Sequence, residues 1–241
     1  MSVFRFKKFE VRNDLAAQKV GTDAVLLGAA MTLPDKAGAQ LLDVGTGTGV
    51  IALMAAQRLA GGGQPFNITA IDIDPAAISE ASANFAASPW APSLQAEAIS
   101  LEDLAQREGL LDAIFSNPPF FHDSLKAPDA RRSAARHTDT LSYREICAFA
   151  SAHLAPDGIL SLILPAEDET PLLRYAASFG LKAFRILRIR TGACKAPKRI
   201  IAEFRCALNK MDDDCRCEEL VLMDGPQRSA AYSELTADFY L

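Results

Sequence analysis

The chain has 241 residues, of which 49% are hydrophobic and 23% are charged, and its formal net charge is −5. This length suits one large α/β domain, and the apolar content is sufficient for a packed core, which excludes an intrinsically disordered chain. The negative net charge disfavours a protein that coats nucleic acid without regard to sequence.

The amino terminus and the cysteines bear on where the protein works. Met1 to Phe9 places basic residues where a secretory signal needs an apolar segment, and no apolar run approaches the ~20 residues that span a bilayer. The five cysteines are odd in number and scattered, which is typical of reduced thiols. Cys215 and Cys217 form one close pair without a second, so we predict no metal ion. These features predict a soluble cytoplasmic protein.

The first predicted element, Phe4 to Phe9, interleaves aromatic with basic residues. This alternation is typical of a strand that covers a sheet edge. The same composition is also typical of a contact with single-stranded RNA, so both interpretations stay open.

The second predicted element is a helix that follows the segment Lys19 to Ala24 and ends near Met31. Gly21 breaks the chain before it, and Thr22 or Asp23 is the expected N-cap, because both side chains can accept a hydrogen bond from the first turn.

A nucleotide-binding pattern follows, with a predicted strand at Leu41 to Val44 and a predicted helix at Val50 to Leu59. Between them lie three glycines in GxGxG spacing, Gly45, Gly47 and Gly49. A strand, a glycine-rich turn and a helix form the ligand cradle of nucleotide-binding α/β domains. The dinucleotide fingerprint needs a small residue at position 50, where this chain has valine, so the loop favours a ligand without a pyrophosphate.

Two aspartates lie at the end of the next predicted strand, Ile68 to Asp72. Asp72 follows the glycine loop by roughly 20 residues, the offset at which an acid binds ribose hydroxyls. Asp74 precedes Pro75 at the start of a predicted helix, which is the arrangement of an N-cap followed by proline. We therefore predict that Asp72 binds a ribose and that Asp74 is a cap.

Predicted strands at Leu94 to Ala98 and Leu111 to Ser116 continue the alternation, and the second ends in Asn117-Pro118-Pro119-Phe120. The two prolines fix their own φ angles and restrict the residues before them, so the chain leaves the strand extended and stiff. Such an exit holds the Asn117 side-chain oxygen and a nearby main-chain carbonyl at a fixed separation, beside the Phe120 ring. Two acceptors and a flat apolar face suit a planar molecule with an amino group, such as adenine. The alternative is a rigid turn whose phenylalanine packs in the core.

A polar segment at 121–140 follows this motif. Loops of this length in a compact domain are usually functional, although a solvated loop is the alternative. The segment carries a group of cationic and imidazole side chains, Arg131, Arg132, Arg136 and His137.

The last third of the chain predicts a helix at 141–154, a turn at 156–158, a buried strand at 158–164, a helix at 171–179 and a hairpin of 181–190 with 199–208. Residues 182–205 carry eight basic side chains against one acid, Glu203. In a net acidic protein this asymmetry is typical of an RNA-binding face. The eight are Lys182, Arg185, Arg188, Arg190, Lys195, Lys198, Arg199 and Arg205.

Strands alternate with helices from Leu41 to Phe179, which predicts an α/β fold with a largely parallel sheet covered on both faces. Without an evident linker or repeat, we expect a single domain with a lead-in at 1–38, a core at 39–208 and an acidic tail at 209–241 that forms a peripheral strand and loop. Ligands of such sheets bind at the carboxyl ends of the strands. The glycine loop, Asp72 and the Asn117 motif all lie there, so we expect them to share one crevice.

With these motifs together, the chain resembles class I S-adenosylmethionine-dependent methyltransferases, and residues 117–120 resemble their amino-methylating motif. To about residue 208 it is similar to the bacterial family of tRNA1(Val) (adenine-37-N6)-methyltransferases. The similarity rests on residues 4–7, 19–24, the glycine loop, 117–121, 135–137 and 197–199. It implies a Rossmann-like, mostly parallel seven-stranded sheet with an antiparallel C-terminal hairpin. It also implies S-adenosyl-L-methionine as cofactor, tRNA as partner and methylation of an adenine beside the anticodon.

The resemblance also implies roles for individual residues. The catalytic residues would be Asn117, Pro118, Pro119 and Phe120. The cofactor-binding residues would be Lys19, Thr22, Asp23, Asp43, Gly45, Thr46, Gly47, Gly49, Asp72, Ile73 and Asn117, with Ser100 in place of the acid that such families often carry after the third strand. The tRNA-binding residues would be Arg5, Lys7, Arg136, His137, Arg190, Lys195, Lys198 and Arg199.

Three alternatives remain open at this point. A methyltransferase acting on the glutamine side chain of a peptide chain release factor would use the same Asn-Pro-Pro-aromatic chemistry, but the basic hairpin favours RNA. A non-catalytic factor that binds the cofactor or RNA would not need Asn117. A dehydrogenase is disfavoured by Val50 and by the lack of evident hydride-transfer residues.

Overall fold

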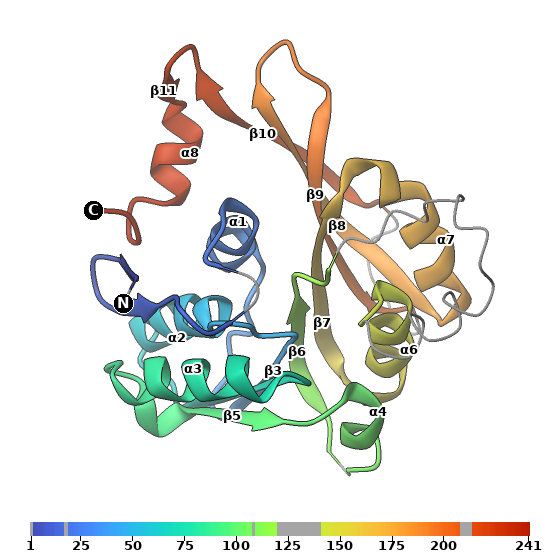
Figure 1. The fold of residues 1–241 in the computed structure, drawn as a ribbon. Coiled ribbons are helices and arrows are strands. Elements are labelled where there is room, and N and C mark those ends of the chain that lie inside the picture. The colour runs from blue at the N-terminus through green and yellow to red at the C-terminus, as the bar shows by residue number, and fades with distance from the viewer. Residues whose placement is uncertain (1, 17–18, 108, 120–140, 208–213) are drawn as a thin grey trace, which may run out of the picture.

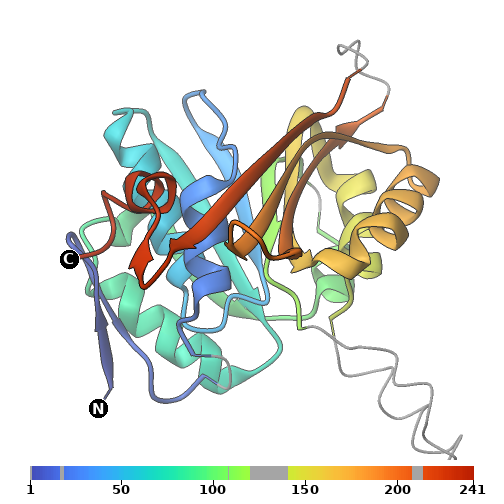
Figure 2. The ribbon, with the colours of Figure 1, turned by 90° about the horizontal axis from the view of Figure 1, so that it is seen from above.

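A computed structural model of the protein describes residues 2–16, 19–107, 109–119, 141–207 and 214–241. Within these residues the main sheet has nine strands, in the order β11-β10-β8-β9-β7-β6-β3-β4-β5. Helices cover both of its faces, and Figure 2 shows the sheet between the two helical layers. The α/β fold and the mostly parallel sheet are thus confirmed.

The parallel half of the sheet contains the elements that the sequence predicts most closely. The strands are β3 (Ala39–Val44), β4 (Phe66–Asp72), β5 (Leu94–Ala98) and β6 (Leu111–Ser116). The associated helices are α2 (Val50–Gly61), α3 (Pro75–Ala86), α4 (Leu101–Leu104) and α6 (Tyr143–His153), with a short 3-10 turn at Ala91–Ser93. β3 pairs in parallel with β4 and with β6, so the glycine loop after β3 lies between the carboxyl ends of its two neighbours.

The sheet separates two apolar clusters, because successive residues of a strand point to opposite faces. Leu41 packs in the cluster that contains α1 (Thr22–Ala30), α2 and α3. Leu42 packs in the cluster that contains α6 and α7 (Glu169–Ser178). Each of these leucines is 1% exposed, and burial of such a side chain contributes roughly 2 kcal/mol.

The C-terminal half, with both parallel and antiparallel pairings, completes the sheet, which has nine strands within the described residues instead of the predicted seven. It consists of β7 (Leu154–Pro165), β8 (Leu181–Gly192), β9 (Pro197–Cys206), β10 (Arg216–Asp224) and β11 (Gln227–Arg228), with a 3-10 turn at Ala166–Asp168 and helix α8 (Ala230–Leu235). The predicted hairpin is confirmed as β8 with β9, and β9 also pairs antiparallel with β7. The predicted turn at 156–158 is wrong: these residues belong to β7, where the register shifts against β6.

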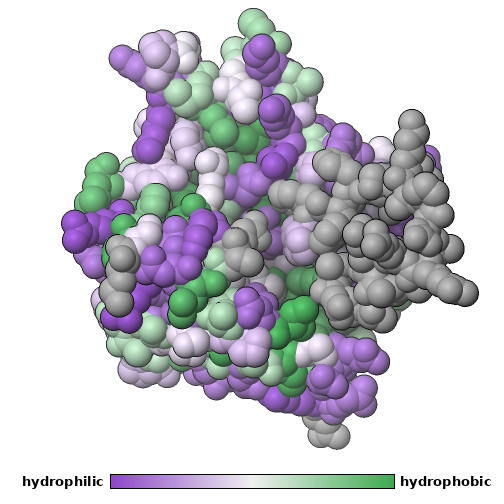
Figure 3. Space-filling model, viewed as in Figure 1, coloured by the Kyte–Doolittle hydropathy of each residue, from purple (hydrophilic) through white to green (hydrophobic). Residues whose placement is uncertain are grey.

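The acidic C-terminal segment is more deeply integrated than a peripheral strand and loop. β10 pairs in parallel with β8 along most of its length, and the Phe239 side chain is 2% exposed in the core. Figure 1 shows β10 as a long strand that leads to β11 and α8 beside the amino terminus. Figure 3 shows a mixture of hydrophilic and apolar residues over the two upper tips, with apolar residues between them.

The amino-terminal segment departs from the prediction of a strand on the sheet edge. β1 (Val3–Arg5) and β2 (Glu10–Arg12) pair with each other in a separate two-stranded sheet. The rings of Phe6 and Phe9 stack at 4.5 Å and are buried in the core. These aromatic side chains therefore have a packing role. None of the helices in the described ranges is long and apolar enough to cross a membrane.

Candidate active site

A cavity of about 290 Å³ opens at the carboxyl ends of β3 and β6. Seven predicted site residues line it: Lys19, Thr22, Asp23, Gly45, Thr46, Gly47 and Asn117. Five further lining residues are not among the predicted ones: Gly21, Ala24, Thr48, Val50 and Ile51. The glycine loop and the Asn117 motif therefore share one crevice, as the topology predicts.

The glycine loop is held against β4 by its own amide groups. The N–H groups of Gly45 and Thr46 donate to the Ile71 carbonyl at 2.9 and 3.0 Å. The N–H of Gly47 donates to Asp72 Oδ2 at 3.0 Å. A phosphate-binding loop would direct these donors at its ligand. The bonding is therefore consistent with a ligand that lacks a pyrophosphate.

Gly49 has a packing role and does not line the cavity. Its φ angle is +80°, in the left-handed region that favours glycine, and it is the N-cap of α2. A Cβ atom at this position would lie 2.5 Å from the Phe85 ring on α3. Gly49 thus permits close approach of α2 and α3.

Asp43 contacts the glycine loop through Thr46 and does not line the cavity. Its side chain is fully buried, and the Thr46 hydroxyl donates to Oδ2 at 2.7 Å. Oδ1 has no hydrogen-bond partner among the described residues. Burial raises the pKa of Asp43 to about 7, against the lowering effect of the Thr46 hydrogen bond. Direct cofactor contact by Asp43 is not supported; its contact is with Thr46, which lines the cavity.

Two aspartates lie at the carboxyl end of β4, and Asp74 has its predicted role as a helix cap. The Asp74 side chain caps α3 by accepting the Ala76 N–H at 2.9 Å. Asp72 accepts the N–H groups of Gly47 and Asp74, one on each oxygen. A carboxylate has about four lone-pair sites, so both oxygens keep capacity for ribose hydroxyls. Neither Asp72 nor Ile73, which is 57% exposed, lines the cavity itself.

Ser100 acts as a helix cap. Its hydroxyl oxygen accepts the Asp103 N–H at 3.0 Å and donates to Asp103 Oδ2 at 2.7 Å. It does not line the cavity. The expectation that Ser100 replaces the acid after the third strand is therefore unsupported.

The N-terminus of α1 faces the cavity without a side-chain cap. The N-cap is Gly21, so the prediction of Thr22 or Asp23 as cap is wrong. Among the described residues, no acceptor binds the N–H groups of Thr22, Asp23 and Ala24. Free amides at a helix N-terminus, together with the helix dipole, favour an anionic group.

Two buried polar residues of α3, absent from the predicted site, hold the segment that leads to Lys19. The Glu80 carboxylate accepts three consecutive backbone N–H groups, those of residues 14–16, at 2.6 to 2.9 Å. Asn84 exchanges two hydrogen bonds with the Arg12 backbone and donates to the Thr48 carbonyl at 2.9 Å. Their i, i+4 spacing places them on one face of α3, but it does not show what this face contacts.

Asn117 combines burial with an unsatisfied acceptor at the cavity wall. Its side chain is 7% exposed, and Oδ1 has no hydrogen-bond partner among the described residues. The preceding Ser116 hydroxyl donates to the Val44 carbonyl at 2.7 Å, which joins β6 to β3 where the motif begins. Pro118 is buried and Pro119 is exposed. Phe120, Arg131, Arg132, Arg136 and His137 lie outside the described residues.

The cations predicted to form an RNA-binding face are largely paired with acids from other segments. Arg185 binds Glu203 and Glu218, Arg188 binds Glu169, Arg190 binds Glu219, and Arg199 binds Asp23. At the amino terminus, Arg5 pairs with Glu10, and Lys7 Nζ donates to the Ala237 carbonyl at 2.6 Å. Lys195 and Lys198 are exposed and make no ion pair within the described residues. The hairpin is thus a weaker cationic surface than its sequence indicates.

Known proteins match this chain at the level of family and fold. A family model described as the methyltransferase small domain matches residues 17–173. The tRNA1(Val) (adenine(37)-N6)-methyltransferase of Phocaeicola vulgatus is 40% identical over 242 residues, which cover 99% of this chain and 97% of the relative. The protein of the same name from Photobacterium profundum is 38% identical, over 99% of this chain and 98% of the relative.

Two solved structures of low sequence identity show the same fold. A protein from Agrobacterium tumefaciens, described as a predicted O-methyltransferase, gives a TM-score of 0.64 at 16% identity and covers 90% of this chain and 96% of its own. A ribosomal protein L11 methylase from Lactobacillus delbrueckii gives 0.50 at 19% identity, with 76% of each chain covered.

Proposed function

This chain belongs to the methyltransferase small domain family and to the family of tRNA1(Val) (adenine(37)-N6)-methyltransferases, and we propose that it methylates N6 of an adenine in tRNA. It is an S-adenosyl-L-methionine-dependent enzyme. We further propose that the adenine is that at position 37, beside the anticodon, and that the enzyme acts in the cytoplasm.

The observation that carries this proposal is the unsatisfied oxygen of Asn117. A buried amide oxygen without a partner costs about 1–3 kcal/mol, so a folded protein retains it where a ligand completes the bond. Here Asn117 lines the cavity and precedes two prolines that stiffen the backbone. An amino group is the donor that an amide oxygen and a neighbouring carbonyl bind together.

The described residues also fit the methyl donor. The free amides of α1 suit its carboxylate, the Asp23 carboxylate suits its ammonium group, and Asp72 keeps acceptor capacity for its ribose. The glycine loop, whose amides are already bonded to β4, suits a ligand without phosphate. When bound, S-adenosyl-L-methionine supplies an electrophilic methyl group on sulfur.

The chemistry needs positioning more than activation. Asn117 Oδ1 and the Pro118 carbonyl accept the two N–H groups of the adenine amine and hold its lone pair directed at the methyl donor. The lone pair would form the new N–C bond to the methyl group that the bound cofactor supplies, with the S–C bond broken in the same step, and the surplus amine proton would leave to solvent. Orientation of this kind can supply about 7–11 kcal/mol of a barrier. We propose that Phe120, outside the described residues, stacks on the base.

The test is methyl transfer from labelled S-adenosyl-L-methionine to unmodified total tRNA, with a peptide chain release factor as a parallel acceptor. We expect label in tRNA and N6-methyladenosine after digestion. Label in the release factor alone would keep the Asn117 chemistry and replace the substrate. Cofactor binding without transfer to either acceptor would favour a non-catalytic binding protein.

A further inference from the structure

We infer that Arg199 is a positioning residue of the cofactor cavity. It holds Asp23 in place through an ion pair and is not a contact for tRNA. The inference rests on the proposed function, because it assumes that the cavity binds S-adenosyl-L-methionine. It also changes the role that the resemblance implies for Arg199.

The ion pair joins the cavity wall to the interior of the sheet. Arg199 Nε donates to Asp23 Oδ2 at 2.8 Å, and the two side chains are 31% and 24% exposed. Arg199 lies on β9 opposite Pro165 of β7 and Ile189 of β8, so both neighbouring strands fix its backbone. Its Nη1 also donates to the Lys198 carbonyl at 3.1 Å. The guanidinium is thus committed to contacts within the protein.

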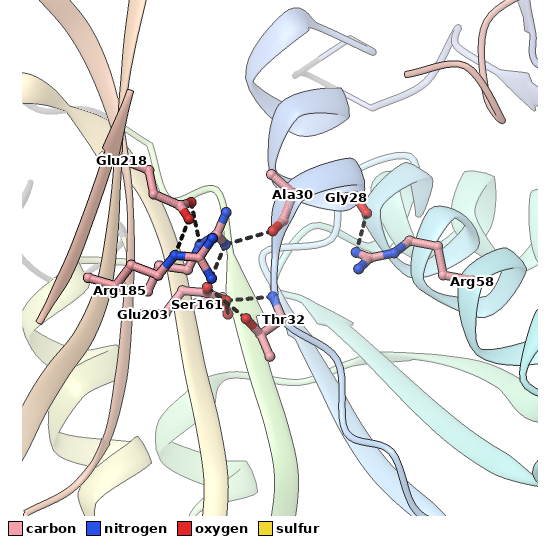
Figure 4. A network of polar contacts seen from close by, with 9 residues as sticks. Gly28, Ala30, Thr32, Arg58, Ser161, Arg185, Glu203 and Glu218 are labelled. Atoms are coloured by element: carbon pink, nitrogen blue, oxygen red, sulfur yellow. Dashed lines mark hydrogen bonds and ion pairs between the residues drawn. The ribbon is translucent and has the colours of Figure 1, made fainter. Parts of the chain in front are cut away.

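A second polar network fixes the other end of α1 to the same strands, as Figure 4 shows. The buried Glu203 carboxylate accepts the Thr32 N–H at 2.6 Å and the Thr32 hydroxyl at 2.9 Å. Arg185 binds Glu203 at 2.7 Å and donates to the Ala30 carbonyl at 2.8 Å. The C-terminal end of α1 is therefore held independently of Arg199.

At the N-terminal end, Arg199 provides the polar contact that α1 otherwise lacks. Gly21 gives no side-chain cap, and the first turn carries Asp23 into the cavity wall. With Oδ2 bound to Arg199, Asp23 Oδ1 accepts no hydrogen bond within the described residues. A carboxylate fixed in this way binds an ammonium group without first losing rotamer freedom, which is the advantage of preorganisation.

The experiment measures binding of S-adenosylhomocysteine by calorimetry to the wild-type enzyme, Arg199→Gln, Asp23→Asn and the double variant. We expect about tenfold weaker binding for each single variant, and a double variant no weaker than the weaker single variant, because both changes remove one interaction. Arg199→Lys, which keeps the charge, should recover part of the affinity.

Arg188→Gln is the matched control. It removes another ion pair of the hairpin, to Glu169, in which the side chains are 31% and 19% exposed. Its contacts do not involve the cavity, so we expect its S-adenosylhomocysteine affinity to equal that of the wild type. Equal losses in Arg188→Gln and Arg199→Gln would show that the effect is loss of hairpin stability and would overturn the inference.

Binding of tRNA without cofactor separates the two possible roles of Arg199. We expect Arg199→Gln to change tRNA affinity less than twofold and the exposed neighbour Lys198→Gln to lower it. If Arg199→Gln binds S-adenosylhomocysteine as the wild type does but binds tRNA more weakly, the inference is overturned and the proposed function still stands. If the wild-type enzyme binds no S-adenosylhomocysteine, the proposed function fails and the inference with it.

Discussion

At the cavity, Asn117 Oδ1 and the first amides of α1 lack hydrogen-bond partners within the described residues. Along the β8–β9 hairpin, by contrast, Arg185, Arg188 and Arg190 each bind a carboxylate from another segment. The sequence indicates the opposite distribution, because the hairpin has an excess of cations and the cavity residues carry little net charge.

The difference teaches how to separate structural from functional polar groups. A buried polar atom without a partner costs about 1–3 kcal/mol, and it is tolerated where a ligand completes it. An arginine paired with a carboxylate has its charge balanced within the protein, although Arg190 Nε has no hydrogen-bond partner among the described residues. The acidic C-terminal segment has a structural role of this type, since Glu218 and Glu219 pair with Arg185 and Arg190.

The largest expected effect concerns Asn117. Asn117→Ala should lower kcat by about 10³-fold, about 4 kcal/mol, because one of two groups that orient the amine is lost. S-adenosylhomocysteine affinity should change little. Single-turnover methyl transfer and calorimetry measure the two quantities; equal losses in both would show that Asn117 acts as a cofactor ligand and not as a base-orienting group.

A substitution of Glu203 tests whether the paired arginines of the hairpin stabilise the fold. Glu203→Gln leaves Arg185 buried without its full charge partner, so we expect the free energy of unfolding to fall by about 3 kcal/mol. Glu218→Gln is the control, because this second partner of Arg185 is 23% exposed and its removal should cost less than about 1 kcal/mol. Urea unfolding measures both. A larger loss for Glu218→Gln would contradict the assignment.

Asp43 predicts a pH dependence of stability. Its native carboxyl keeps a proton up to about pH 7, whereas that of the unfolded chain loses it near pH 4. Between these values the folded state binds the additional proton, so stability falls as the pH rises. From pH 5.5 to pH 7 the free energy of unfolding should fall by about 1.5 kcal/mol more in the wild type than in Asp43→Asn, whose side chain cannot ionise. The exposed Asp157→Asn should keep the wild-type slope.

The smallest effect concerns the lysines of the hairpin loop. The double change Lys195→Gln and Lys198→Gln should weaken tRNA binding several-fold, about 1 kcal/mol, and lower the salt dependence of affinity. Arg190→Gln should have less effect, because Glu219 already pairs with that charge. Filter binding at two salt concentrations compares the variants. A stronger effect of Arg190→Gln would restore the hairpin arginines as RNA contacts.

The sequence predicts the parallel half of the fold well, because its signals are local. β5 and β6 have the predicted bounds, and Asp74 with Pro75 starts α3 as expected. Apolar runs ended by glycine, proline or aspartate mark strands and helices without knowledge of their neighbours. The shared crevice also follows from topology alone.

The remaining features depend on contacts between distant segments. The partners of the hairpin cations come from residues 23, 169, 218 and 219, so counting charges along the chain cannot reveal the pairing. Glu80 and Asn84 become site residues only through packing of α3 on the amino-terminal segment. The cap of α1 was missed because Thr22 and Asp23 are already helical, and Asp23 binds Arg199 instead.

Hydrogen exchange with and without saturating S-adenosylhomocysteine tests most directly whether the cavity holds the methyl donor. The amides of Thr22, Asp23 and Ala24, which lack acceptors within the described residues, should exchange rapidly alone and slow markedly with the ligand. The amides of β8, already paired in the sheet, should not change. Unchanged exchange at the start of α1, with protection elsewhere, would contradict the account.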